Sequence, residues 1–282
     1  MTPSVWPLSQ HRRSSEHRQG ASDDMLALLR GGEGDTLDAR VESVAFECLA
    51  DGLADDRVMS LLRVLGWRDD FTCFTVAGTP AKGIGDSSRL IREAIRNLGG
   101  SNCIIGVRGT WCVALVEMQS AVTPEVACTA MADAFHAQLP LCLGPVRHRV
   151  EGAQRSVRSV LAALAAAAAV PALPRPMRAD DVLPERALLG DEDARNELVN
   201  EVYRSLRGDN ADDPTLTTVS TFLKSGNSLE TTAKELNVHP NTVRYRLKRA
   251  AETTGWDATD PREGYVLQTA IALGLMKDAA QS

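Results

Sequence analysis

Apolar residues recur at helical spacing near the start of the chain. Between residues 25 and 68 they return every three or four positions, and a glycine-rich break at 31–34 interrupts them. This pattern predicts a helical N-terminal region over 25–68. Residues 1–24 are polar and have no sustained period, so they predict a disordered N-terminal tail.

The period changes at about residue 69. Short β-branched or aromatic runs predict strands at 71–76, 103–107, 111–116 and 141–144, and helical patterns predict helices at 87–98, 124–139 and 151–170. The two central strands flank Arg108, Gly109 and Thr110, which is typical of a hairpin. The order β-α-β-β-α-β predicts a ferredoxin-like domain over 69–170, in which antiparallel strands carry helices on one face.

A proline-rich stretch separates this domain from the rest of the chain. Four prolines between residues 170 and 185 predict a linker over 171–190. Helical patterns then return at 193–206 and 215–224, and we expect an all-α domain over 191–282. The predicted fold class is therefore α+β, with a ferredoxin-like middle domain and an all-α C-terminal domain.

Composition and charge narrow the class of protein. No stretch reaches the roughly 18 uncharged apolar residues of a membrane span, and the first residues lack the apolar centre of a secretory signal, so we expect a cytoplasmic protein. The net charge of -6 excludes a protein that coats nucleic acid, so any DNA contact must come from a local basic patch. The six cysteines show no paired spacing, and we expect no metal site and no cofactor.

The run 225–249 has the pattern of two helices joined by a tight turn. We expect Asn227 to cap the first helix, with Glu230 bonding back in a capping box. Ala233 supplies the small residue that a helix crossing at about 90 to 120° requires. The turn at 237–239 has Val238 to fill the corner, and Pro240 is preset for the first helical position. Together these features predict a helix-turn-helix.

The second helix of this motif separates two faces. Val243, Leu247 and either Ala250 or Ala251 fall at helical spacing and are expected to point inward. The opposite face carries Asn241, Arg244, Tyr245 and Lys248, while Arg246 and Arg249 lie along a flank. Arg246 stands where many such helices have an apolar residue, which leaves the rotation of the helix open by about one residue. Residues 240–249 contain four cations and no acid, which is the local patch that the net charge requires.

This arrangement predicts how the helix would meet DNA. An α-helix fits the major groove, where the residues at its N-terminal end contact base edges. We expect Asn241, Arg244 and Tyr245 to read bases, and Thr242, Arg246, Lys248 and Arg249 to contact phosphates. The alternative is a solvated basic helix in an ordinary bundle.

The same residues resemble a known family. The stretch 238–247, followed by Thr254-Gly255-Trp256-Asp257 and a helix over 265–275, resembles the C-terminal domain of PucR-type (CdaR-type) bacterial transcription regulators. In that family this domain follows a degenerate, GGDEF-like cyclase domain of the β-α-β-β-α-β kind, which the pattern at 69–170 predicts independently. The resemblance implies a regulator that binds double-stranded operator DNA. Because helix-turn-helix proteins usually bind as dimers, we expect a homodimer.

One segment resembles a narrower group. Residues 256–267 look most like the actinobacterial activators of the fatty-acid synthase operon, which implies control of fatty-acid biosynthesis and a long-chain acyl-CoA effector. Two alternatives stay open. One is a PucR-type regulator of another metabolic operon, for purine, amino-acid or sugar-acid use, and the other is a signalling adaptor without base readout.

The middle domain lacks the residues of an active cyclase. A diguanylate cyclase carries a Gly-Gly-acidic-Glu-Phe turn between its central strands, and acidic residues that hold Mg²⁺. Here the turn is Arg108-Gly109-Thr110 and the first strand ends in Ala77-Gly78. We therefore expect a sensing or dimerisation domain that is not an enzyme.

Overall fold

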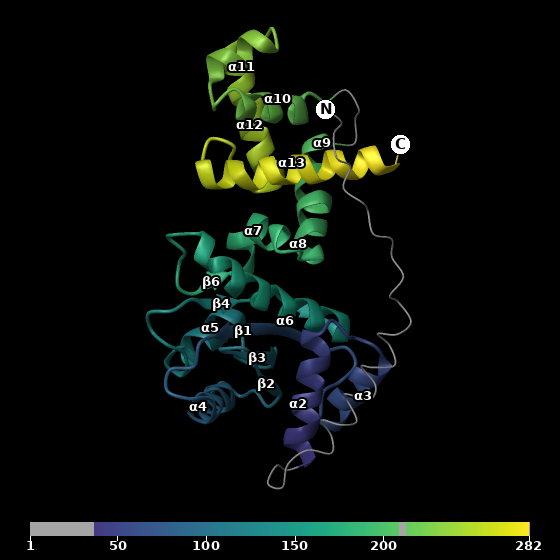
Figure 1. Cartoon of the computed structure of the whole chain (residues 1–282), viewed down its shortest axis with the longest axis vertical. Helices are drawn as coiled ribbons and strands as arrows, with labels where there is room; N and C mark the ends of the chain where they lie inside the picture. The colour runs from purple at the N-terminus through teal and green to yellow at the C-terminus, as the bar shows by residue number, and fades with distance from the viewer. Residues whose placement is uncertain (1–36, 209–212, 282) are drawn as a thin grey trace, which may run out of the picture.

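The computed structural model describes residues 37–208 and 213–281. The tail predicted over 1–24 and the first part of the predicted helical region, 25–36, lie outside the described residues. Figure 1 shows two parts stacked along the longest axis, a sheet with its helices below and a helical bundle above. Helices α7 (Leu183–Leu188) and α8 (Glu192–Glu197) lie between the two parts (Figure 1).

The lower part is built on a six-stranded sheet. The elements in the predicted order are β1 (Thr72–Gly78), α4 (Ile84–Asn97), β2 (Cys103–Arg108), β3 (Trp111–Glu117), α5 (Pro124–Ala130) and β4 (Leu141–Leu143). The strand order β2-β3-β1-β4 with antiparallel neighbours is that of a ferredoxin-like sheet, which confirms the prediction. Two short strands add to it, because β5 (Arg147–His148) pairs with β1 and β6 (Met177–Arg178) runs parallel to β4.

Helices cover both faces of this sheet, so the prediction of helices on one face was wrong. Along β1, Phe74 and Val76 pack in the core with α4 and α5, whereas Cys73 and Ala77 pack in the core on the opposite face. Successive strand residues point to opposite faces, and here both sets are apolar. The second face is covered by α2 (Leu37–Ala50), α3 (Asp56–Val64) and α6 (Arg149–Ala166).

Helix α2 also protects the sheet at β2, which is an edge strand. The Glu42 carboxylate accepts a hydrogen bond of 2.7 Å from the backbone N–H of Ile105. Both of its oxygens also accept from Nη2 of Arg92 on α4. Phe46 lies so close to Gly106 that a β-carbon there would overlap its ring. The glycine therefore permits the close approach of helix and strand.

Two predicted helices end earlier than expected. The helix predicted over 124–139 stops at Ala130, and a 3-10 turn, Ala132–Ala134, follows it. The backbone then becomes extended, because Phe135 forms an antiparallel bridge with Pro80. The ring of Phe135 is buried in the core with α4 and α5. In the same way, the helix predicted over 151–170 changes to a 3-10 turn at Ala167–Ala169.

The range expected as a linker, 171–190, contains ordered elements. It holds β6, the 3-10 helix η3 (Ala179–Val182) and α7 (Leu183–Leu188). Composition alone favours a linker here, but Met177, Val182 and Leu183 are buried. Their burial fixes the segment against both parts of the molecule.

The upper part is all-helical, as expected. The predicted helix 193–206 is a continuous helical segment formed by α8 (Glu192–Glu197), the π-helical η4 (Leu198–Tyr203) and α9 (Arg204–Arg207). It is followed by α10 (Thr215–Lys224), α11 (Leu229–Glu235), α12 (Pro240–Thr254) and α13 (Pro261–Gln281). These helices share one hydrophobic core. Among the described residues, no helix is long and apolar enough to cross a membrane.

Candidate nucleic-acid interface

Helix α10 ends in two left-handed residues that set the start of the next helix. Gly226 has φ +71° and Asn227 has φ +63°, and the backbone N–H of Asn227 donates to the carbonyl of Phe222 at 3.0 Å. Asn227 therefore closes α10. The predicted cap at Asn227 was wrong by one residue, because the Ser228 hydroxyl caps α11 by accepting from the N–H of Thr231 at 3.2 Å.

The turn between α11 and α12 has the predicted chemistry. Asn237 adopts φ +52°, a conformation that asparagine tolerates, and the N–H of Val238 donates to the carbonyl of Ala233 at 2.9 Å. Ala233 is buried at the helix crossing. His239 precedes Pro240 and caps α12, with its Nδ1 accepting from the N–H of Asn241 at 3.2 Å.

The inward face of α12 is Val243, Leu247 and Ala250, which are all buried. This confirms the predicted face and selects Ala250 over Ala251. It also fixes the rotation of the helix that the position of Arg246 left open in the sequence. The side chains of Asn241, Arg244, Tyr245 and Lys248 consequently point to solvent.

Four of the predicted contact residues form one exposed surface, here called the outer face of α12: Asn241, Arg244, Tyr245 and Lys248. Arg244 donates from Nη1 to the Oδ1 of Asn241 at 2.7 Å, so the two side chains are held together. Tyr245 is 67% exposed, so its ring is available for contact on this surface. Lys248 lies 3.8 Å from Glu252, one turn later.

The other predicted residues lie toward α10. Arg246 is half-buried and donates from Nη1 to the Thr218 hydroxyl at 3.2 Å, and Arg249 pairs with Asp213 at 3.2 Å. Thr242 is half-buried between the two faces. The structure therefore divides the predicted set: four residues share the outer face, while Arg246 and Arg249 form a flank beside the start of α10.

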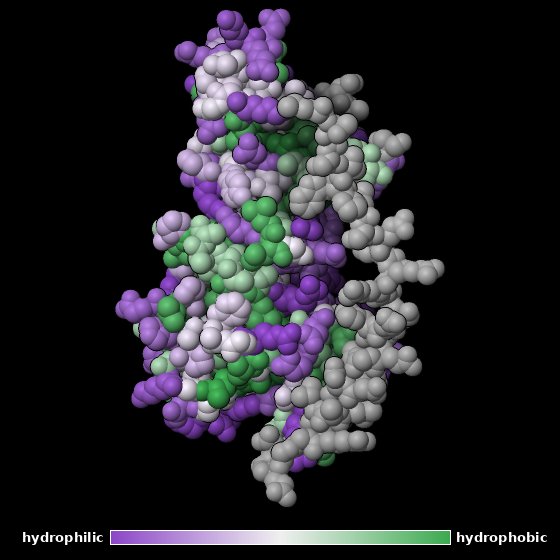
Figure 2. All heavy atoms as spheres, in the orientation of Figure 1, coloured by the Kyte–Doolittle hydropathy of each residue, from purple (hydrophilic) through white to green (hydrophobic). Residues whose placement is uncertain are grey.

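The carboxylate of Asp213 places a negative charge beside the two arginines of this flank. Hydrogen bonds from the side chain and backbone of Thr215 lower the pKa of Asp213, and the charges of Arg249 and Arg246 lower it further. The carboxylate is thus ionised at neutral pH beside two arginines. Sequence reasoning missed this contact, because Asp213 belongs to a loop that the sequence places far from α12. Figure 2 shows that hydrophilic residues gather at the end of the molecule that carries α11.

Cysteine and metal chemistry find no support in the described residues. No group of three or more His, Cys, Asp or Glu side chains among them could hold a metal ion. Burial raises the pKa of the Cys73 and Cys112 thiols to about 12, and that of Cys128 to about 11. These thiols are therefore protonated at neutral pH and behave as small apolar side chains.

The hairpin between β2 and β3 shows what replaces the cyclase turn. Gly109 adopts φ +60°, and Arg108 pairs across the turn with Trp111. The guanidinium of Arg108 forms ion pairs with Glu47 on α2 and with Asp51 just after it. A cation fastened to a neighbouring helix thus occupies the place of an acidic, solvent-facing turn.

Comparison with known proteins agrees with both parts of the fold. Residues 215–273 match the model of the PucR C-terminal helix-turn-helix domain, and residues 50–166 match that of the GGDEF-like domain. The crystal structure of a regulator of polyketide synthase expression from Bifidobacterium adolescentis is 57% identical, with a TM-score of 0.86, over 90% of this chain and 98% of that one. Uncharacterized proteins of Mycobacterium tuberculosis and Mycobacterium bovis are 35% identical over 248 residues, 85% of this chain, which spans 59% of their length.

The chain thus combines a degenerate GGDEF-like domain with a PucR-type C-terminal helix-turn-helix domain. The chain belongs to the PucR family of regulators.

Proposed function

We propose that the protein reads a specific operator through the outer face of α12. The observation that carries this proposal is the exposure of Asn241, Arg244 and Tyr245 on one face near the N-terminal end of that helix. A guanidinium and an amide are the groups that pair with guanine and adenine edges in the major groove. The hydrogen bond between Arg244 and Asn241 limits the freedom of both side chains before DNA binds, which reduces the entropy lost on binding.

The phosphate contacts are proposed for Thr242, Arg246, Lys248 and Arg249. Lys248 lies on the outer face, whereas Arg246 and Arg249 are held on the flank by Thr218 and Asp213. Lys248 continues the outer face toward the C-terminal end of α12, and Arg246 and Arg249 lie along one side of it, where they would meet the phosphate backbone beside the groove. Such contacts set the register of the helix and supply affinity that falls as salt rises.

Two substitutions separate these roles. Arg244→Ala is expected to lose about 1 to 3 kcal/mol of binding to the specific operator and little on other duplexes. Arg249→Ala is expected to weaken all duplexes alike and to flatten the dependence of affinity on salt. Fluorescence anisotropy with operator and shuffled duplexes measures both. Lys82→Ala removes an exposed cation from the lower part and serves as the control. Equal effects of the two arginine variants on both duplexes would contradict the assignment.

The regulated genes are proposed to be those that build long acyl chains. Residues 256–267 resemble activators of a fatty-acid synthase operon, and the Bifidobacterium relative is a regulator of polyketide synthase expression. Both synthases extend a thioester-bound acyl chain, so the two lines of support concern the same chemistry. We accordingly propose a homodimer that controls a fatty-acid biosynthesis operon in response to long-chain acyl-CoA.

The effector proposal has its own test. Saturating palmitoyl-CoA is expected to change operator affinity by about 5- to 150-fold, the usual range of coupling between two sites. Free coenzyme A, purines and amino acids are expected to leave it unchanged. An unaltered affinity with palmitoyl-CoA, or a response to one of the other compounds, would redirect the proposal to another metabolic operon.

A further inference from the structure

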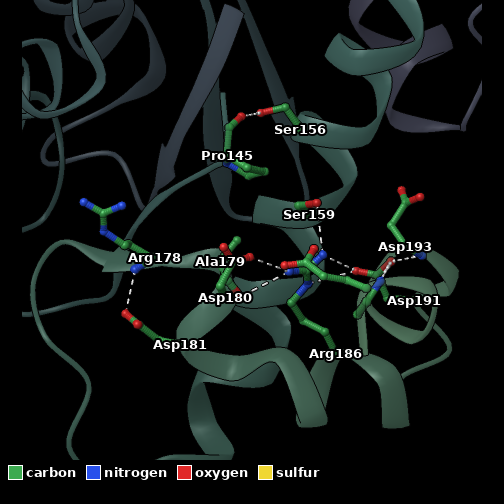
Figure 3. Close-up of polar contacts among 12 residues, drawn as sticks. Pro145, Ser156, Ser159, Arg178, Ala179, Asp180, Asp181, Arg186, Asp191 and Asp193 are labelled. Atoms are coloured by element: carbon green, nitrogen blue, oxygen red, sulfur yellow. Dashed lines mark hydrogen bonds and ion pairs between the residues drawn. The ribbon is translucent and has the colours of Figure 1, made fainter. Parts of the chain in front are cut away.

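Arg186 on α7 is the largest side chain that the described part of the molecule buries completely, with 1% exposed. Its Nε and Nη2 each lie 2.9 Å from Oδ2 of Asp191. Nη2 also donates to the Ser159 hydroxyl at 3.0 Å, and Nη1 donates to the carbonyl of Ala179 at 3.2 Å and to Asp180 at 3.5 Å (Figure 3). Five contacts therefore surround a guanidinium that has five N–H groups.

These contacts join three separate segments of the chain. Ser159 lies on α6, which packs on the sheet, Ala179 and Asp180 lie in η3, and Asp191 precedes α8. A guanidinium is planar and its donors have fixed directions, so it holds its partners in one arrangement. A buried ion pair is weak evidence for stability, but it can select one arrangement over others. The Arg186 cluster thus fixes how α8 leaves the GGDEF-like domain.

Asp191 has a second task in the same cluster. Its Oδ1 accepts from the backbone N–H groups of Asp193 and Ala194 at 3.0 and 3.3 Å and so caps α8. One carboxylate therefore binds Arg186 with one oxygen and begins a helix with the other. The position and direction of α8 follow from the place of Arg186.

The helix that begins at α8 continues to the DNA-binding core. Through η4 and α9 it runs without a break to Arg207, and α9 packs against α12. The ring of Tyr203 lies against the backbone of Gly274 on α13, where a β-carbon would overlap it, and its hydroxyl donates to Asp278 at 2.6 Å. A π-helical segment of this kind is often found at functional positions within helices.

A second contact fastens α7 to the DNA-binding domain directly. Arg262, in the first turn of α13, pairs with both oxygens of Glu185 at 2.5 and 2.6 Å and donates to the carbonyl of Asp181 at 2.8 Å. Glu185 and Arg186 are neighbours in sequence. The short helix α7 is therefore tied to the DNA-binding domain by Glu185 and to the GGDEF-like domain by Arg186.

We infer that Arg186 is a positioning residue for DNA binding: through Asp191 and the helix 192–207 it holds α12 in a fixed orientation on the GGDEF-like domain. The two domains then move as one body, and a change at α6 reaches α12. For its effect on operator binding, this inference rests on the proposed function. Its effect on the coupling of the two domains does not.

The test compares full-length variants. Arg186→Met removes the cluster, and Arg186→Met with Asp191→Asn also removes the unpaired carboxylate while keeping an oxygen to cap α8. Arg155→Met, an exposed arginine on α6, is the control. Calorimetry is expected to show one unfolding transition for the native protein and the control, and two for both variants. Hydrogen exchange is expected to rise over 192–207 and stay unchanged in β1 and β3.

Binding to DNA adds a readout that a loss of stability would not reproduce. We expect the variants to bind a duplex with a single half-site within about twofold of the native protein, and a two-half-site operator about tenfold less well, since coupling between sites commonly reaches this size. Uniformly faster exchange in both domains with a single lowered transition would overturn the inference, as would variants that match the native protein. If Arg186→Met does not fold, the same measurements on the double variant, Arg186→Met with Asp191→Asn, test the inference. If no duplex is bound specifically, the proposed function fails while calorimetry and exchange still test the coupling.

Discussion

Individual residues on α12 differ in what holds them. Arg244 is hydrogen-bonded to Asn241 on the same helix. Outside the helix, Arg246 is hydrogen-bonded to Thr218 and Arg249 forms an ion pair with Asp213. The sequence places all three arginines in one basic run, because charge and spacing are visible there. Which partner each one meets depends on α10 and the loop before it, and that contact is set by tertiary packing.

Removing the partner of Arg249 is expected to strengthen DNA binding, whereas removing Arg249 itself is expected to weaken it. In the native protein the N–H of Thr215 donates to Oδ1 of Asp213 at 2.8 Å. Asp213→Asn removes the negative charge beside the flank but keeps an oxygen that can accept this hydrogen bond. Because Arg249 would then be free to meet a phosphate, we expect affinity for every duplex to rise by about two- to fivefold at low salt.

Anisotropy titrations of Asp213→Asn beside Arg249→Ala measure this effect. The gain should shrink as salt rises, since it is electrostatic. Asp69→Asn, which removes an exposed carboxylate paired with Arg63 in the lower part of the molecule, is a matched charge control. Weaker binding by Asp213→Asn at unchanged thermal stability would show that the flank does not face DNA.

At the scale of elements, local signals were sufficient for most boundaries. Helix α10 spans 215–224 as predicted, and the β2–β3 hairpin turns at Gly109 as predicted, because proline, glycine and apolar spacing act within a few residues. The cap of α11 was misplaced by one residue since Asn227 and Ser228 are both good caps. The left-handed backbone at Asn227, imposed by the end of α10, decides between them.

Elements that depend on distant partners could not be predicted. Strands β5 and β6 have two residues each: β5 pairs with the start of β1, which β4 leaves unpaired, and β6 pairs with the outer edge of β4. The end of α5 depends on the bridge from Phe135 to Pro80, more than fifty residues earlier. The buried Arg186 is a cation in a proline-rich stretch, so composition favours a solvated linker there.

At the scale of the whole molecule, a chain with net charge -6 still has four cations and no acid within residues 240–249. The four cations of α12 lie in the upper part, while the sheet and its helices form a body below, and Figure 1 shows α7 and α8 between the two. This arrangement suits a regulator whose lower part reports on its surroundings and whose upper part meets DNA. It also predicts that specificity and salt dependence arise from the same small surface.

The most direct measurement is equilibrium binding of the full chain to the duplex upstream of its own gene and to a shuffled duplex, from about 50 to about 200 mM salt. We predict that affinity falls steeply with salt for both duplexes, while a preference of about 10³-fold or more for the upstream duplex persists across the range. Equal affinity for the two duplexes would contradict base reading by the outer face of α12, and binding that does not change with salt would contradict the proposed phosphate contacts.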